Sequence, residues 1–168
     1  NLGDPLSGEF HLGLIPTLAP YLLPHIMPGL ISGLPRMNFF LHEQQTSDLI
    51  QALDQGKLDA LILPWLDDMT DFEAYDLFEE PFVLAVNKGH QLAKKKRVKL
   101  TDIAGCHVLT LEDGHCLRDQ ALGYCFSAGA DEDKRFQATS LETLRYMVAS
   151  GIGITLLPKL SVIDQREN

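Results

Sequence analysis

The sequence predicts an α/β protein made of two lobes. Segments with the apolar patterns of strands and of helices alternate along the chain, and glycine and proline separate them. Of the 168 residues, 45% are hydrophobic, which is enough to bury a substantial core. The formal net charge of -9 leaves no excess of lysine and arginine to neutralise phosphates, so we expect this stretch not to bind nucleic acid by itself.

The first lobe is predicted to follow a linker-like segment, rich in glycine, proline and serine, that ends before Phe10. Its expected elements are a strand over residues 9–15, a proline-containing helix over 18–33, a strand over 37–42, a helix over 49–56 and a strand over 58–63. Thr17 and Thr46 are predicted to cap the two helices. This order of elements implies right-handed crossovers and a parallel sheet, so both threonines are expected at the carboxyl ends of strands, beside a crevice.

The second lobe is predicted to begin near Phe78, which gives lobes of residues 1–78 and 79–168. Its expected elements are a strand over residues 81–87, a short helix near 101, a strand over 107–111, a helix over 116–129, a strand over 135–139, a helix over 140–151 and a strand over 154–158. Thr139 and Glu142 are predicted to form a capping box on the last helix. The acidic residues 131–133 are predicted to lie in a loop.

The longest apolar stretch, from Leu12 to Leu34, is interrupted by four prolines and contains His25. It therefore has the pattern of neither a membrane span nor a signal peptide. Three cysteines are too few for a disulfide scaffold in a chain of this length. We expect a cytoplasmic protein whose cysteines are thiols or pair only transiently.

Cys116 stands at the predicted start of a helix, after Gly114 and His115 and two residues before Arg118. The N–H groups and positive dipole end of a helix start, a guanidinium and an imidazolium all favour a thiolate, which is the form that attacks peroxide. The alternative is that Cys116 is a small buried apolar residue, because cysteine outside disulfides is among the most buried residue types.

A second thiol, Cys125, lies nine positions further along the same predicted helix. A sulfenic acid at Cys116 would need such a partner to form a disulfide. In a continuous helix the two Cα atoms would be about 13.5 Å apart and on nearly opposite faces, whereas a disulfide requires about 4.4–6.8 Å. If the disulfide forms, the segment must exist in two conformations, which another domain can detect. An inert core cysteine is the alternative for Cys125.

The remaining cysteine and the other histidines are not predicted to react or to bind a metal. Cys106 has no neighbouring group that would activate it, and we assign it a structural role. Metal sites in sequences show short, regular spacings between cysteine and histidine ligands. The cysteines show no such spacing to five of the histidines, and these five show none among themselves: His11, His25, His42, His90 and His107. We predict neither a metal site nor a cofactor.

Two parts of the chain resemble a known family. The redox segment of the OxyR family of LysR-type transcription regulators closely resembles LEDGHCLRDQALGYCFSAGADED (111–133) and ATSLETLRYMVASGIGITLLP (138–158). The first lobe of that family resembles GLIPTLAPYLLPHIMP (13–28) and LHEQQTSDLIQALDQGKLDALIL (41–63). The similarity covers most of the chain, and motifs of this length rarely match by chance.

The resemblance implies a cytoplasmic protein, a homodimer or homotetramer, that senses hydrogen peroxide. Such a protein activates antioxidant genes by binding DNA and contacting RNA polymerase. The implied fold is two Rossmann-like lobes joined by a hinge, as in periplasmic binding proteins. The resemblance implies a switch and not an enzyme, whose disulfide a thiol reductant such as glutaredoxin would reduce.

By motif position, the resemblance implies that Cys116 is the peroxidatic cysteine and that Cys125 resolves it by forming a disulfide. It also implies four residues that line the peroxide pocket with Cys116: His115, Arg118, Thr17 and Thr46. Two hydroxyls and an imidazole can hold the two oxygens of peroxide, while positive charge stabilises the departing hydroxide. The crevice between the lobes is expected to bring both threonines towards Cys116.

Two parts of the family pattern have no counterpart in this sequence. One is the DNA-binding part, a winged helix-turn-helix with its linker helix, that precedes this region in the family. The other is the C-terminal segment that follows the 154–158 strand and returns to complete the first lobe. We therefore expect this chain not to activate transcription alone and to have unpaired sheet edges.

Two other classes of function stay open. A thiol peroxidase would use the same two cysteines, but the sequence lacks a thioredoxin-like pattern, and a pair that must unwind a helix suits a slow switch better than rapid turnover. A LysR effector domain for a small organic ligand, or a periplasmic solute receptor, would have the same fold. The paired cysteines, and the lack of a signal-peptide pattern, argue against this third class.

Overall fold

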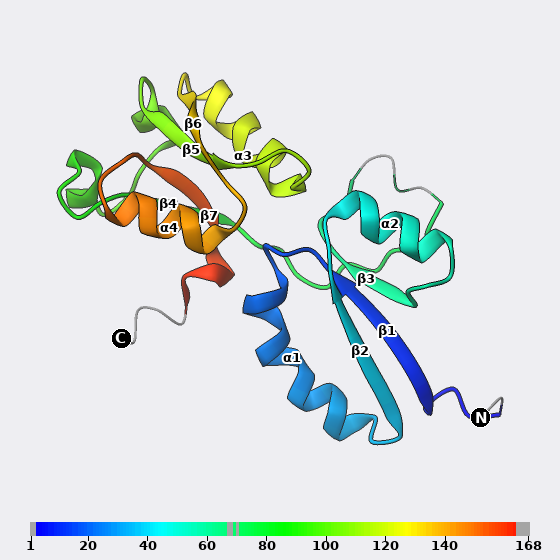
Figure 1. Ribbon diagram of the computed structural model, residues 1–168. Helices are drawn as coiled ribbons and strands as arrows, with labels where there is room; N and C mark the ends of the chain where they lie inside the picture. Colours follow the sequence, from blue (N-terminus) through cyan, green and yellow to red (C-terminus); the bar gives the residue numbers. More distant parts are fainter. Residues whose placement is uncertain (1–2, 67–68, 70, 164–168) are drawn as a thin grey trace. The chain divides into compact units, whose positions relative to one another are not determined.

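The computed structural model describes residues 3–66, 69 and 71–163. The chain divides into two compact units, Asn1–Phe78 and Glu79–Asn168 (Figure 1). Both units combine strands and helices, which confirms the predicted α/β class. No helix among the described residues is long and apolar enough to span a membrane.

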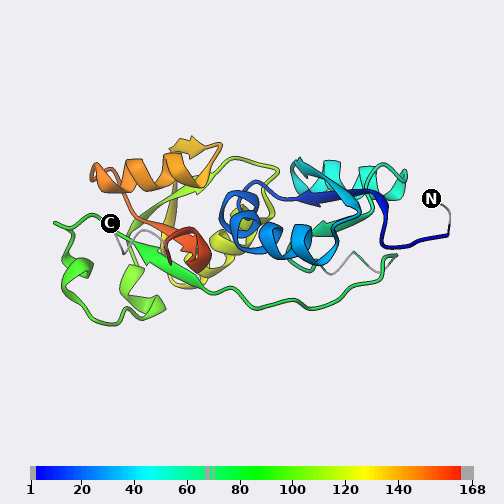
Figure 2. The same cartoon turned by 90° about the horizontal axis from the view of Figure 1, so that it is seen from below.

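The described part of the first unit contains a three-stranded parallel sheet and two helices. The strands β1 (Gly8–Leu14), β2 (Met37–Glu43) and β3 (Ala60–Ile62) lie in the order β2-β1-β3. The helices α1 (Ala19–Gly33) and α2 (Thr46–Asp54) connect them. Because the two crossovers run in opposite directions across the sheet, right-handed connections place the helices on opposite faces, as Figure 2 shows. The predicted parallel sheet is confirmed.

Gly13 allows α2 to pack directly on this sheet. A Cβ atom at Gly13 would lie 2.7–2.8 Å from side-chain atoms of Leu49, Leu58 and Leu61, which is closer than van der Waals contact permits. Leu49 belongs to α2 and is fully buried. The neighbouring Leu14 is buried on the other face of β1, as the alternation of side chains along a strand requires.

Thr17 does not cap α1, so that prediction is wrong. The N-cap residue is Leu18, and no side-chain hydrogen bond caps the helix. The N–H groups of Leu18 and Ala19 both donate to the carbonyl of Ile15, at 3.1 and 3.0 Å. A backbone turn therefore satisfies the helix start, and the hydroxyl of Thr17 is not needed for it.

The described part of the second unit has two pairs of strands. Its elements are β4 (Phe82–Ala85), η1 (Gln91–Lys94), η2 (Leu100–Ile103), β5 (His107–Leu111), α3 (Cys116–Ser127), β6 (Asp131–Ala138), α4 (Leu141–Ala149), β7 (Thr155–Pro158) and η3 (Lys159–Ser161), where η marks a 3-10 helix. Strands β5 and β6 are parallel, whereas β4 and β7 are antiparallel. A parallel bridge between Val108 and Ile154 links β5 to the residue before β7. Local patterns did not predict the antiparallel pair, because strand direction depends on partners distant in sequence.

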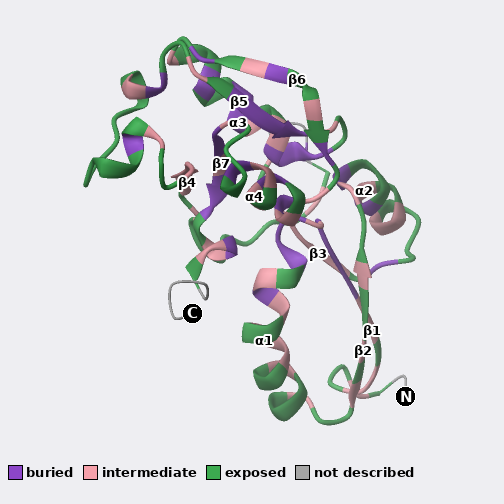
Figure 3. Ribbon diagram, turned by 60° about the vertical axis from the view of Figure 1, so that its left-hand side comes forward, coloured by how far each residue is buried: buried purple, intermediate pink, exposed green. Residues whose placement is uncertain are grey.

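A hydrophobic cluster joins α3 to the strands of the second unit. Its buried members are Leu92, Ile103, Val108, Cys125, Ala130 and Ile154. Figure 3 shows that β5 and β7 lie in the buried interior. The C-terminal half of α3 is therefore fixed to the core through Cys125.

Strand β6 begins earlier than predicted. Residues 131–133 belong to this strand and not to a loop. Glu132 pairs with Arg118, and Asp133 pairs with Arg135. These cationic partners explain why an acidic run is stable in a strand, and the partner of Glu132 is remote in sequence.

The N-cap of α4 lies one residue later than predicted. Ser140 Oγ accepts a hydrogen bond from the N–H of Thr143 at 3.2 Å. The predicted capping box of Thr139 and Glu142 is therefore wrong. Glu142 instead accepts a hydrogen bond from Arg145 Nη1 at 2.8 Å, one turn along the helix.

Candidate functional site

Cys116 is the first residue of α3, and its side chain is buried. The turn that leads into the helix includes Gly114, whose φ of 99° lies in the region that favours glycine. His115 is the N-cap residue and makes no side-chain capping bond. The backbone N–H groups and the positive end of the helix dipole thus lie beside Cys116, and both favour a thiolate.

Cys125 lies on the same helix, fully buried in the hydrophobic cluster. Burial raises the pKa of the Cys125 thiol above its ordinary value. This thiol therefore stays protonated at neutral pH for as long as it remains in the core.

The two cysteines cannot join in this structure. Helix α3 is continuous from Cys116 to Ser127, and nine residues of helix separate Cα atoms by about 13.5 Å, roughly twice the distance a disulfide allows. The chain's cysteines are thiols. The geometry is that of a reduced pair whose oxidation requires α3 to unwind.

His115 is buried, with 6% of its surface exposed. Burial lowers the pKa of His115 despite the opposing charge of Glu112. The imidazole is therefore neutral at pH 7, which corrects the expectation of an imidazolium beside Cys116. Its Nε2 atom is buried and has no hydrogen-bond partner among the residues that the structure describes.

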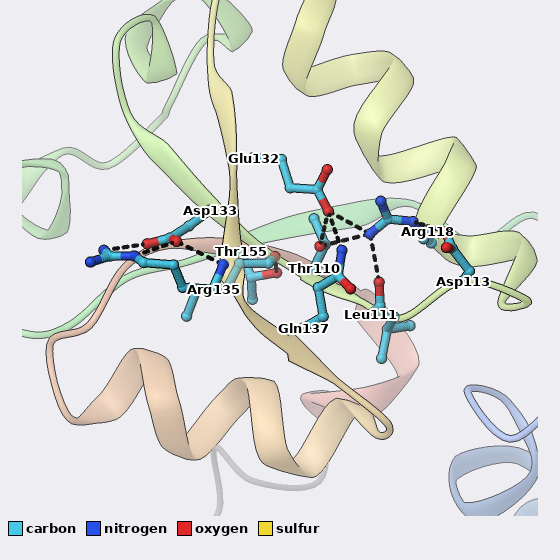
Figure 4. A network of polar contacts seen from close by, with 10 residues as sticks. Thr110, Leu111, Asp113, Arg118, Glu132, Asp133, Arg135, Gln137 and Thr155 are labelled. Atoms are coloured by element: carbon cyan, nitrogen blue, oxygen red, sulfur yellow. Dashed lines mark hydrogen bonds and ion pairs between the residues drawn. The ribbon is translucent and has the colours of Figure 1, made fainter.

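Arg118 points away from the helix axis into the sheet, where it meets several acceptors (Figure 4). Its Nη1 donates to Thr110 Oγ1 at 2.9 Å, to the carbonyl oxygen of Leu111 at 2.8 Å and to Glu132 Oε1. Its Nε lies 3.0 Å from Asp113 Oδ1. Two carboxylates thus compensate the positive charge that was expected to act on Cys116.

Glu132 is a site residue that the sequence analysis missed. Its side chain is 4% exposed and ion-paired with Arg118. Burial alone would raise its pKa, but hydrogen bonds from Arg118, Thr110 and Gln137 outweigh burial and hold the pKa of Glu132 below its ordinary value. No local pattern marked Glu132, because it stands in a run of charged residues that is typical of a loop.

Thr17 and Thr46 belong to the first unit, and both are buried. Thr17 lies in the turn between β1 and α1. Thr46 is the first residue of α2 and follows the N-cap Gln45, so the prediction that Thr46 caps this helix is wrong. Thr46 Oγ1 and His115 Nε2 are the two buried side-chain polar atoms without a hydrogen-bond partner in the described part of the chain.

Cys106 is half-buried and packs against the edge of the hydrophobic cluster. The backbone holds it there, because its carbonyl accepts the N–H of Asp131 at 3.0 Å. Over residues 3–66, 69 and 71–163, no group of three or more histidine, cysteine, aspartate or glutamate side chains is arranged to hold a metal ion.

Comparison with known proteins identifies the class to which this two-unit fold belongs. The family model described as LysR substrate binding domain matches residues 3–168. The chain therefore belongs to the LysR substrate-binding domain family.

Within this family, the chain is similar to OxyR. It is 55% identical, over 98% of its length, to a "Hydrogen peroxide-inducible genes activator" of Pectobacterium carotovorum subsp. carotovorum, of which it covers 55%. The chain thus spans about half the length of the curated relatives that it matches.

Solved structures of OxyR in two redox states have the same fold. The oxidised form is 55% identical with a TM-score of 0.86, over 96% of this chain and 76% of that chain. The reduced form is 50% identical with a TM-score of 0.88, over 98% of this chain and 77% of that chain. The similarity to both forms agrees with the expected peroxide-responsive family.

Proposed function

We propose that the chain is the hydrogen-peroxide-sensing regulatory part of a LysR-type transcription activator. The observation that carries the proposal is the position of Cys116 and Cys125, one at the start of a continuous helix and the other in the core. A disulfide between them requires a different backbone, which couples the oxidation state to the conformation. The similarity to an oxidised and a reduced form of OxyR supports this interpretation.

The proposed chemistry has two steps. The Cys116 thiolate attacks one oxygen of hydrogen peroxide, the O–O bond breaks, and the departing hydroxide takes up a proton to become water, which leaves a sulfenic acid. After α3 unwinds, the Cys125 sulfur attacks the Cys116 sulfur, the S–O bond breaks, and a second water leaves. Two thiols thus give two electrons and two protons to one peroxide. A thiol reductant such as glutaredoxin would reverse the disulfide by exchange.

The proposal assigns peroxide binding to Thr17, Thr46 and His115. Thr46 Oγ1 and His115 Nε2 support the assignment, because each is a buried polar atom without a hydrogen-bond partner in the described part of the chain. Peroxide can both donate and accept hydrogen bonds. Arg118 suits another role than stabilising hydroxide, since Glu132 and Asp113 already compensate its charge.

The remaining proposals concern the longer protein. Residues 1–78 and 79–168 would be two lobes joined by a hinge. A helix-turn-helix domain would bind DNA, the protein would act in the cytoplasm as a homodimer or homotetramer, and it would contact RNA polymerase. The name of the Pectobacterium relative, a genes activator, supports gene activation.

We propose a switch and not an enzyme. The Cys125 thiol is fully buried, and its pKa is raised by that burial. It must leave the core before it can attack the Cys116 sulfur, which suits a single event better than rapid turnover. Peroxide should therefore be consumed stoichiometrically.

One measurement tests the proposed function directly. Reduced protein under nitrogen receives one equivalent of peroxide, followed by intact-mass spectrometry and peptide mapping. The parent chain should lose two hydrogen atoms in a Cys116–Cys125 crosslink. Cys125→Ser should stop at one added oxygen on Cys116, and the control Cys106→Ser should behave as the parent does.

Two results would contradict the proposal. If Cys116 oxidises no faster than Cys106, a ligand-binding effector domain becomes the better account. If a small dithiol sustains peroxide consumption at an enzyme-like rate, the protein is a peroxidase and not a switch.

A further inference from the structure

A buried ion pair joins the first turn of α3 to the sheet formed by β5 and β6. Arg118 lies in the first turn of α3, and its side chain is 10% exposed; Glu132 lies on β6, and its side chain is 4% exposed. The same Glu132 oxygen, Oε1, also accepts hydrogen bonds from Thr110 Oγ1 at 2.8 Å and from Gln137 Nε2 at 3.2 Å (Figure 4). This cluster therefore connects α3, β5 and β6 through one carboxylate.

An irregularity in β6 brings these groups together. Val108 pairs with Glu132, but Thr110, only two residues further along β5, pairs with Gln137. Three more residues of β6 than of β5 lie between these two pairs, and Asp133 and Arg135 bind each other within that bulge. Because the extra residues are accommodated there, Glu132 and Gln137 both reach Thr110 and Arg118. Such bulges commonly aim side chains at functional sites.

The cluster acts on the turn that carries Cys116. The N–H of Arg118 donates to the His115 carbonyl at 3.0 Å, which closes the first turn of α3 around Cys116. The Arg118 side chain holds that turn against β5, where Leu111 also accepts a hydrogen bond. Unwinding this turn must therefore move the guanidinium and break its hydrogen bonds with Glu132 and Leu111.

We propose that Glu132 is a positioning residue of the redox switch: through Arg118 it holds the first turn of α3, and with it Cys116, in the helical arrangement of the thiol form. This inference rests on the proposed function. Breaking a buried pair by removing one partner is strongly unfavourable. If the pair exists only in the thiol form, its loss destabilises that form selectively and makes the Cys116–Cys125 disulfide easier to form.

The test is the midpoint potential of the Cys116–Cys125 disulfide in the whole 168-residue chain. Protein is equilibrated in mixtures of reduced and oxidised glutathione, alkylated, and the disulfide fraction is measured by peptide mass spectrometry. For Glu132→Gln we expect at least a tenfold larger equilibrium constant for disulfide formation, a shift of about 30 mV to more negative potential.

Asp113→Asn is the matched control. Asp113 binds the same guanidinium, but its side chain is 94% exposed, so we expect less than a threefold change. Glu132→Asp keeps the charge on a shorter side chain and should fall between the parent and Glu132→Gln. It also keeps the test decisive if Glu132→Gln folds poorly.

The outcomes separate this inference from the proposed function. Glutathione buffers need no peroxide, so the midpoint can be measured even if peroxide fails to react with Cys116. A midpoint unchanged in both Glu132 variants, with equal losses of thermal stability in the thiol and disulfide forms, would show a purely structural ion pair and overturn the inference. A disulfide that forms normally with glutathione but not with peroxide would contradict only the proposed function.

Discussion

Thr46 and His115 each bury a polar atom that has no hydrogen-bond partner among the described residues. Leaving such an atom unpaired costs about 1–3 kcal/mol, and folded proteins contain few of them. Stability alone would favour valine or leucine at such positions. The two side chains therefore fit a ligand-binding role at the scale of single residues, which is the role we propose for them.

The buried imidazole of His115 predicts a specific pH dependence of stability. The pKa of His115 is lowered by burial, whereas in the unfolded chain it is about 6.5. As the pH falls from about 7 towards the folded-state pKa, the unfolded chain binds a proton that the folded chain does not. The thiol form therefore loses stability over this range, by at most about 1.4 kcal/mol per pH unit for one proton.

Replacing His115 with asparagine checks the sign of this pH dependence. His115→Asn should lose less free energy of unfolding than the parent between pH 7.5 and 5.5, as measured by urea unfolding of the reduced proteins. Between pH 7.5 and 8.5 neither state of His115 binds a proton, so the gap between the two proteins should stay constant there. Parallel curves down to pH 5.5 would contradict a buried neutral histidine.

At the scale of elements, helix α3 is fixed at both ends by different forces. A buried ion pair, Arg118 with Glu132, holds its first turn, and the apolar cluster around Cys125 holds its C-terminal half. Gly123 lies in that C-terminal half, two residues before Cys125, and is exposed. Glycine weakens a helix interior by roughly 1 kcal/mol relative to alanine, so Gly123 lowers the cost of unwinding the helix next to Cys125.

This arrangement predicts that oxidation removes the helix. In the disulfide form, backbone amides between Cys116 and Cys125 should lose hydrogen-exchange protection, because their helical hydrogen bonds cannot persist when the two Cα atoms approach. Helix α4 (Leu141–Ala149), which carries no cysteine, serves as the internal control and should keep its protection. An oxidised monomer with unchanged exchange across α3 would refute the spacing argument.

At the scale of the whole molecule, the net charge of -9 governs interactions with polyanions. A protein that binds duplex DNA through phosphates needs clustered lysine and arginine to release counterions. We expect the chain alone to show no binding to duplex DNA by fluorescence anisotropy at low salt, in either redox state. Binding that weakens steeply as salt is added would contradict this expectation and locate a phosphate-binding surface within these 168 residues.

The sequence by itself determined the α/β class, the parallel sheet of the first unit and the start of α3 at Cys116. These features follow from local rules: the apolar period of strands and helices, the glycine and proline at their ends, and the crossover geometry that alternating elements impose. The spacing of Cys116 and Cys125 was also readable, because helix rise converts nine positions directly into a distance.

Only the tertiary structure decided what surrounds these residues. The antiparallel pairing of β4 and β7 depends on contacts between distant segments, and the neutral state of His115 depends on burial that no local pattern encodes. The pairing of Arg118 with Glu132 depends on the bulge in β6. The physical reason is common to all three: pairing, desolvation and ion-pair formation are set by groups that approach through folding and not by neighbours along the chain.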